Sequence, residues 1–210
     1  MAKNLKYSAV LKNAQQAAIT TTVGASAVLD ILSGTQPANP DTAITSQVVL
    51  SSHICNVTFA PAPSAGVLTM NAVAAGTGTA GAGAGTQATW FRLKNATGPV
   101  PHADGTVGTP VTNALTASMA GGLITVTAAA AATLAVGQEI TGSGLPAGTT
   151  ITALGTGTGG TGTYYVNTAA TLASQAMTAS TVFDLTINNA SIATGQTVNI
   201  TTGGTFTNAQ

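Results

Sequence analysis

Charge is nearly absent from this chain, and that scarcity limits what the chain can fold into. Of its 210 residues, five are Lys or Arg and five are Asp or Glu, so the formal net charge is zero. No charged residue lies in the stretch from position 42 to position 91. An ordinary soluble domain has about a quarter of its residues charged, and its surface uses that charge to keep copies apart. So little charge suits a protein that packs against other proteins, or one that needs no charge chemistry.

The apolar residues favour thin β-layers over one thick globule. Hydrophobic residues make up 44% of the chain, many of them alanine, whereas aromatic residues make up 4%. A core of Val, Ile, Leu and Ala buries less area per residue than one built on Phe and Trp. Because thin layers are only marginally stable alone, we expect the chain to form homo-oligomers or to dock on another protein.

The N-terminal segment is the one stretch typical of a helix. Residues 4–22 are rich in Ala, Leu, Lys and Gln and contain neither Gly nor Pro, a composition that favours helix. Leu11, Ala14 and Ala18 recur at helical spacing and share one face. Gly24 is a typical residue for the end of such a helix.

The remainder alternates between short β-rich runs and turn residues, which predicts an all-β fold. Expected strands cover residues 27–32, 47–50, 53–59, 67–73, 89–93, 123–127, 138–141, 149–154, 163–166, 182–187 and 196–201. The Gly/Ala/Thr tract at residues 74–87 is expected to be a loose loop, and Asp104-Gly105 a tight turn. We therefore expect a jelly-roll-like or related β-sandwich with one N-terminal helix, and a smaller β-sandwich or barrel module within residues 110–181.

Two motifs in the middle of the chain resemble a β-rich module that recurs in structural and fibre proteins of tailed bacteriophages. They are GSGLPAGTTI at Gly142–Ile151 and GTGTYYV at Gly160–Val166. The flanks are similar to a small phage virion protein, through AITT at residues 18–21, SGTQPANPDTAI at 33–44, WFRLKNATG, DGTVGT and the segment 184–201. Relatives of that kind commonly lack the middle module. The resemblance therefore implies an insertion at 110–181 in a host domain made of residues 1–109 and 182–210.

The resemblance implies a structural role in the virion. It suggests a non-enzymatic decoration or cement protein on the capsid exterior, with the major capsid protein and further copies of the chain as partners. The alternative is a head- or tail-fibre component that presents the loops of the β module to the host surface. A third class, an enzyme such as a glycan hydrolase, would need a close pair of carboxylates, and the five acids are scattered along the sequence: Asp30, Asp41, Asp104, Glu139 and Asp184.

The motifs that could bind a cofactor, a metal or a substrate are weak. Both G-x-G-x-x-G matches, at residues 76–81 and 155–160, lack the strand–helix context that dinucleotide binding requires. His53 and Cys55 would share one face of a strand, but two ligands are too few for a metal site, so we expect a core or interface pair. His102 and Asp104 could form a local hydrogen bond, and nothing selects one serine as a nucleophile. We predict no catalytic, cofactor-binding or metal-binding residue, no cofactor and no small-molecule substrate.

Partner contacts are expected at two places. Lys3, Lys6, Tyr7 and Lys12 make the N-terminus either a solvated end or a contact arm. Trp90 and Phe91 should point to opposite faces of their strand, so that one is core and the other could anchor a partner.

The remaining sequence features bear on nucleic acid, membrane and redox chemistry. Five basic residues are too few to displace counterions from nucleic acid. We expect no membrane span, no signal peptide in MAKNLKYSAV, and synthesis in the host cytoplasm. Cys55 is the single cysteine, so an intrachain disulfide is excluded and a buried, inert thiol is expected.

Overall fold

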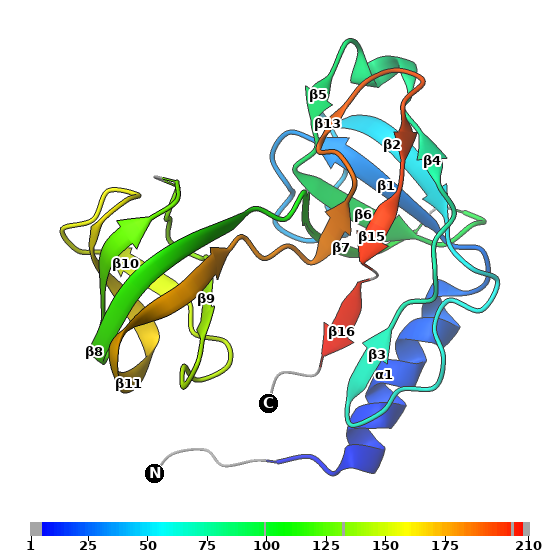
Figure 1. The fold of residues 1–210 in the computed structure, drawn as a ribbon. Helices are drawn as coiled ribbons and strands as arrows, with labels where there is room; N and C mark the ends of the chain where they lie inside the picture. The colour runs from blue at the N-terminus through cyan, green and yellow to red at the C-terminus, as the bar shows by residue number, and fades with distance from the viewer. Residues whose placement is uncertain (1–5, 99, 132, 203, 208–210) are drawn as a thin grey trace. The chain divides into compact units, whose positions relative to one another are not determined.

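The structure is a computed structural model that describes residues 6–98, 100–131, 133–202 and 204–207 (Figure 1). The chain divides into two compact units, the first made of Met1–Thr109 with Phe183–Gln210 and the second of Pro110–Val182. These boundaries lie within one residue of those expected from the sequence. Strands make up 47% of the chain and helix 9%, which confirms the all-β class with one N-terminal helix.

Helix α1 (Ala9–Val23) begins later than expected because Ser8 caps it. The Ser8 side chain accepts a hydrogen bond from the Leu11 backbone N at 3.2 Å, which satisfies a donor at the start of the helix. The helix ends at Gly24, whose φ is +76°. The face with Leu11, Ala14 and Ala18 is exposed, whereas Gln16 and Val23 are the buried residues of the helix.

A six-stranded sheet organises the first unit, in the order β15-β12-β7-β6-β1-β2. Its strands are β1 (Val28–Ser33), β2 (Val48–Ile54), β6 (Trp90–Lys94), β7 (Pro101–Gly108), β12 (Leu185–Ile187) and β15 (Ile200–Thr202). Its neighbouring strands are antiparallel except β7 and β12, which are parallel. One face of the sheet carries the apolar core, which includes Leu29, Ile31, Phe91 and Leu93.

The parallel pair explains where the second unit is inserted. Leu185 pairs with Val107, and Thr186 with Gly108. Parallel neighbours cannot be joined by a tight hairpin and need a crossover of about a dozen residues or more. Residues 110–182, which form the second unit, supply that crossover.

Short strand pairs complete the first unit. They are β3 (Val67–Thr69) with β16 (Thr205–Thr207), β4 (Gly76–Thr77) with β14 (Thr197–Val198), and β5 (Thr86–Gln87) with β13 (Ser191–Ile192); η1 (Ala80–Ala82) is a turn of 3-10 helix. The expectation of a loose loop at 74–87 is therefore wrong. A Cβ on Gly78 would lie 2.0 Å from the carbonyl oxygen of Ala193, so the glycine is what lets the two segments approach.

The expected turn at Asp104-Gly105 is also wrong, because both residues lie inside β7. The chain reverses earlier, where the Asn95 backbone N donates to the Val100 carbonyl at 3.3 Å. Gly105 faces Phe91 across the β6–β7 pair, and a Cβ there would lie 2.6 Å from the phenyl ring. This glycine makes room for a ring rather than for a turn.

The second unit is a curled sheet built on two long strands, β8 (Thr112–Ala129) and β11 (Gly162–Ser180). β9 (Glu139–Gly142) and β10 (Ile151–Leu154) pair with β11 along its other edge. Just past its end β8 curls back on its own start, since the Ala130 backbone N donates to the Ala114 carbonyl at 2.8 Å. The enclosed core includes Leu115, Met119, Ile124, Ile151, Tyr164 and Met177.

Tyr164 fixes the glycine-rich loop before β11. Its hydroxyl accepts from the Gly159 backbone N at 3.0 Å and donates to the Gly160 carbonyl at 2.7 Å. A Cβ on Gly157 would lie 2.3 Å from the Tyr164 ring. The tyrosine and the glycines of the GTGTYYV region therefore depend on one another for packing.

Candidate functional site

A row of polar side chains crosses four strands on the face of the first sheet opposite the apolar core. The row runs across neighbouring strands: Asp30 of β1 lies opposite Ser52 of β2 and Arg92 of β6. Arg92 in turn lies opposite Asp104 of β7. With Lys94, these residues are named the charge row. Since buried charges are costly unless they are paired, the buried charges of Asp30, Arg92 and Asp104 each need a partner within the row.

Arg92 and Asp104 form a two-point ion pair. The guanidinium donates from Nε to Oδ1 at 2.8 Å and from Nη2 to Oδ2 at 2.7 Å, and the side chains are only 4% and 2% exposed. The hydrogen bond to Asp104 raises the pKa of Arg92 above its usual value. Nη1 donates to the Thr42 carbonyl at 3.0 Å, so the pair also ties the segment between β1 and β2 onto the sheet.

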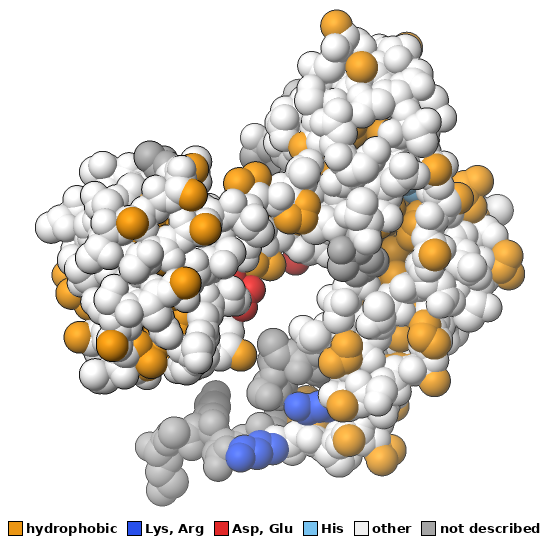
Figure 2. All heavy atoms as spheres, viewed as in Figure 1, with side chains coloured by type: hydrophobic (Ala, Val, Ile, Leu, Met, Phe, Trp, Pro, Cys, Tyr) orange, Lys and Arg blue, Asp and Glu red, His pale blue; other side chains and the backbone are white. Residues whose placement is uncertain are grey.

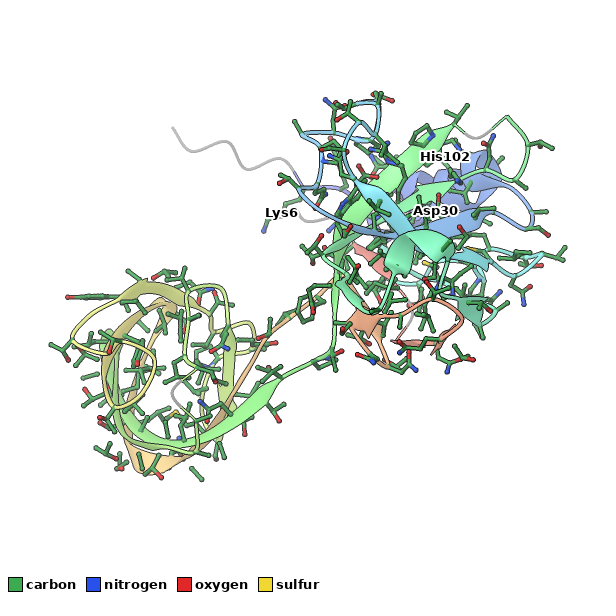
Figure 3. All side chains as sticks on the ribbon, turned by 90° about the horizontal axis from the view of Figure 1, so that it is seen from above. Lys6, Asp30 and His102 are labelled. Atoms are coloured by element: carbon green, nitrogen blue, oxygen red, sulfur yellow. The ribbon has the colours of Figure 1, made fainter. Side chains whose placement is uncertain are left out.

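Asp30 has two donors of its own. Its carboxylate accepts from the Ser52 hydroxyl at 2.6 Å and from the Lys94 ammonium. Asp30 is 2% exposed, and Figure 3 shows it within the first unit. Both acids of the row are therefore neutralised by a cation inside the same sheet.

Trp90 and Phe91 point to opposite faces of β6, as expected, but neither side chain is exposed. The expectation that one of them is an exposed anchor for a partner is therefore wrong for the chain by itself. Trp90 is 1% and Phe91 5% exposed. β6 lies between β1 and β7 and is covered on both faces: Phe91 enters the apolar core, and the Arg92 guanidinium lies 5.2 Å from the centroid of the Trp90 ring. The indole Nε1 is buried and has no hydrogen-bond partner among the described residues.

The N-terminal arm is only partly available for contact. Lys3 lies outside the described residues, Lys6 is exposed at the outside of the first unit (Figure 3), and Tyr7 and Lys12 are half-buried. The Lys12 stem lies against the turn at Gly66, where a Cβ would be 3.1 Å from it. Lys12 is therefore part of the docking of α1, beside the hydrogen bond from the Gly66 backbone N to Asn13 Oδ1 at 2.7 Å.

The charge that remains on the surface is sparse. In the described part of the chain, the ion pairs are Arg92–Asp104 and Lys94–Asp30. On the face drawn in Figure 2, blue and red side chains occupy small areas of a largely white surface. Large apolar side chains are exposed instead, among them Ile54 at 60% at the end of β2, Val57 at 72% just beyond it, and Val10 at 80% on α1.

Ser51 and His53 form a hydrogen-bonded pair that solvent does not reach. The Ser51 Oγ and His53 Nε2 lie 3.0 Å apart, and His53 Nδ1 lies 3.0 Å from the Ala74 carbonyl, so Nδ1 carries the proton and Nε2 accepts from the serine. Both residues are 0% exposed, and burial lowers the pKa of His53. Cys55 is also buried, at 4% exposure, and burial raises its pKa to about 11. The expected core placement of His53 and Cys55 is confirmed.

His102 does not hydrogen-bond Asp104. The β6–β7 pairing shifts register between Leu93 and Lys94, and such a bulge re-aims a side chain. His102 instead lines a small cavity with Ile19 and Val23 of α1, and its Nε2 is buried with no partner among the described residues. Across the described ranges, no group of three or more His, Cys, Asp or Glu is placed to hold a metal ion.

The charge row is the feature that sequence reasoning missed. A signal was present: Asp30 and Arg92 each interrupt an apolar strand, as VLDIL and WFRLK. A charge at such a position is expected to be buried and paired. Its partner could not be identified, because pairing joins residues from strands that are far apart in sequence.

Comparisons with known proteins found nothing similar: no protein-family model matches the chain, and no significant match was found among curated proteins or among solved structures. Within the described residues, no helix has the length and apolar character needed to span a membrane.

Proposed function

We propose that the chain is a non-enzymatic structural protein of a tailed-phage particle that binds the lattice of the major capsid protein and stabilises the shell. The observation that carries the proposal is the placement of charge. Four of the ten charged residues are paired within the charge row, and the exposed surface of the first unit offers apolar side chains at Ile54 and Val57. The resemblance of the Gly142–Ile151 and Gly160–Val166 motifs to phage structural modules supports the same role.

The proposed mechanism is mechanical. Apolar and backbone contacts across capsomer boundaries would add binding free energy without much dependence on ionic strength, since salt screens charged contacts far more than apolar ones. Shell stabilisation follows by mass action, because a ligand that binds only the assembled lattice favours that lattice.

The test uses particles of the phage that encodes this chain, stripped of it and then reloaded with purified protein. We expect rebinding at a copy number comparable with that of the major capsid protein, persistence in high salt, and a higher temperature of particle disruption. Ile54→Asp with Val57→Asp should abolish rebinding, whereas Ala38→Asp, at an exposed position of the same unit, should not. Release by moderate salt would count against the proposal.

The alternative is a fibre or receptor-binding component. The long glycine- and threonine-rich loops of the second unit favour it, since such loops can present side chains to a cell surface. Quantitative mass spectrometry of intact particles separates the two roles, because a fibre component would be present at a small fraction of the copy number of the capsid protein.

A further inference from the structure

A cavity of about 230 Å³ in the first unit combines aromatic walls with a carboxylate, that of Asp184, for which no ion pair is found among the described residues. It is lined by Phe91, Asp104 and Gly105 from the sheet, by Gly204 and Phe206 near the C-terminal end, and by Asp184. The carboxylate of Asp104 is already paired with Arg92. Phe206 is held in place by Phe59, with ring centroids 6.1 Å apart and planes tilted by 53°. This cavity is named the Asp184 pocket.

The carboxylate of Asp184 is held in one orientation. Its Oδ2 accepts from both the backbone N and the hydroxyl of Thr106, each at 2.8 Å, and the Asp184 backbone N donates back to that hydroxyl at 3.2 Å. The same oxygen would lie 3.0 Å from a Cβ on Gly105, so the missing side chain leaves space beside the carboxylate. No hydrogen bond to Oδ1 is seen among the described residues.

The charge of Asp184 is uncompensated, unlike that of the acids in the charge row. Asp30 and Asp104 pair with Lys94 and Arg92, whereas no ion pair of Asp184 is found in the described part of the chain. A fixed carboxylate beside aromatic rings is complementary to an organic cation, which can stack on a ring and donate to the carboxylate together.

We propose that the Asp184 pocket binds the guanidinium or ammonium end of a basic side chain presented by a partner protein. The volume suits one side chain, and the unpaired carboxylate supplies the charge complementarity. This inference does not rest on the phage role, because the pocket is tested with small cations and purified protein.

The experiment is an NMR titration of the full chain with methylguanidinium chloride and, separately, n-butylammonium chloride, against potassium chloride at equal ionic strength. We expect saturable shifts of the Asp184 carboxyl carbon and of the Phe91 and Phe206 ring signals with the organic cations only. Asp184→Asn can still accept from Thr106 but lacks the charge, so the affinity should fall roughly three- to tenfold.

Two further variants keep the result interpretable. Asp41→Asn removes an exposed acid elsewhere in the same unit and should leave the titration unchanged. Phe206→Leu should lower the affinity for methylguanidinium more than the affinity for n-butylammonium, since the planar cation stacks on the phenyl ring more favourably. Absence of saturable shifts in the wild type, or equal affinity in Asp184→Asn, would overturn the proposal.

A second copy of the chain is the other candidate occupant, through its exposed Lys6. In that case the pocket signals would shift with protein concentration alone, and Lys6→Gln would abolish that shift. Such a result would overturn the assignment of the pocket to a different partner protein.

Discussion

The guanidinium of Arg92 donates to both carboxylate oxygens of Asp104, across the boundary between β6 and β7 and out of contact with solvent. Removal of one member leaves the other as an unpaired buried charge. We expect Arg92→Ala to lower the free energy of unfolding of the first unit by about 3–5 kcal/mol, measured by urea denaturation followed through Trp90 fluorescence. Arg92→Met combined with Asp104→Leu should recover most of that loss, and a double variant as unstable as the single one would contradict this explanation.

Stability should fall as the pH drops below the ordinary histidine value. Burial lowers the pKa of His53 below 6.5, so the unfolded chain takes up a proton at a pH where the folded chain does not. The free energy of unfolding therefore decreases as the pH falls through 6.5 towards the folded value, at a rate of up to about 1.4 kcal/mol per pH unit. His53→Gln should flatten that slope in urea denaturation between neutral and mildly acidic pH. Ser51→Ala, which keeps the imidazole, should preserve it.

The thiol of Cys55 should be nearly inert in the folded protein. Its pKa rises from 9.0 to about 11, which lowers the reactive thiolate fraction by about 100-fold below pH 9. Labelling with a thiol reagent should therefore be at least about 100-fold slower in buffer than in urea. The control is an exposed thiol introduced by Ser46→Cys in a Cys55→Ala background. It should be labelled at similar rates in buffer and in urea. Fast native labelling of Cys55 would mean that this part of the core opens readily.

Gly78 should not tolerate even one added carbon. A Cβ there would lie 2.0 Å from the Ala193 carbonyl oxygen, and backbone cannot move aside as a side-chain end can. We expect Gly78→Ala to cost about 1–3 kcal/mol or more, seen as a lower melting temperature in calorimetry. Gly122→Ala is the matched control, because its nearest neighbour would be a carbonyl oxygen at an ordinary 3.4 Å, and its effect should stay within about 0.5 kcal/mol.

The first unit should fold without the second. Replacement of residues 110–182 by a flexible Gly/Ser linker of about a dozen residues, long enough for the parallel crossover, keeps both strands of the β7–β12 pair and the whole apolar core of the first unit. The single Trp of the chain, Trp90, is 1% exposed, so the shortened protein should retain blue-shifted fluorescence and a cooperative unfolding transition. Red-shifted emission would show that the two units depend on each other for folding.

Local sequence patterns anticipated most of the strands but not their lengths. The alternation at 123–127 and 163–166 marks the best-patterned parts of β8 and β11, yet these strands extend over 18 and 19 residues. Their further parts are Ala, Thr and Ser, whose alternation carries little hydrophobic contrast. Pairing with the neighbouring strand, rather than propensity, extends them.

The sequence by itself determined the all-β class, the N-terminal helix and the small number of charged residues, because these follow from composition and from spacing over a few residues. The tertiary structure decided which charges neutralise each other, which face of α1 is buried, and why Gly78 and Gly105 must be glycine. Those outcomes depend on the order β2-β1-β6-β7 and on contacts between residues that lie far apart along the chain. A pattern of neighbours along one strand cannot encode the partner across it, so the Arg92–Asp104 pair and the Asp184 pocket become visible only when the strands are assembled.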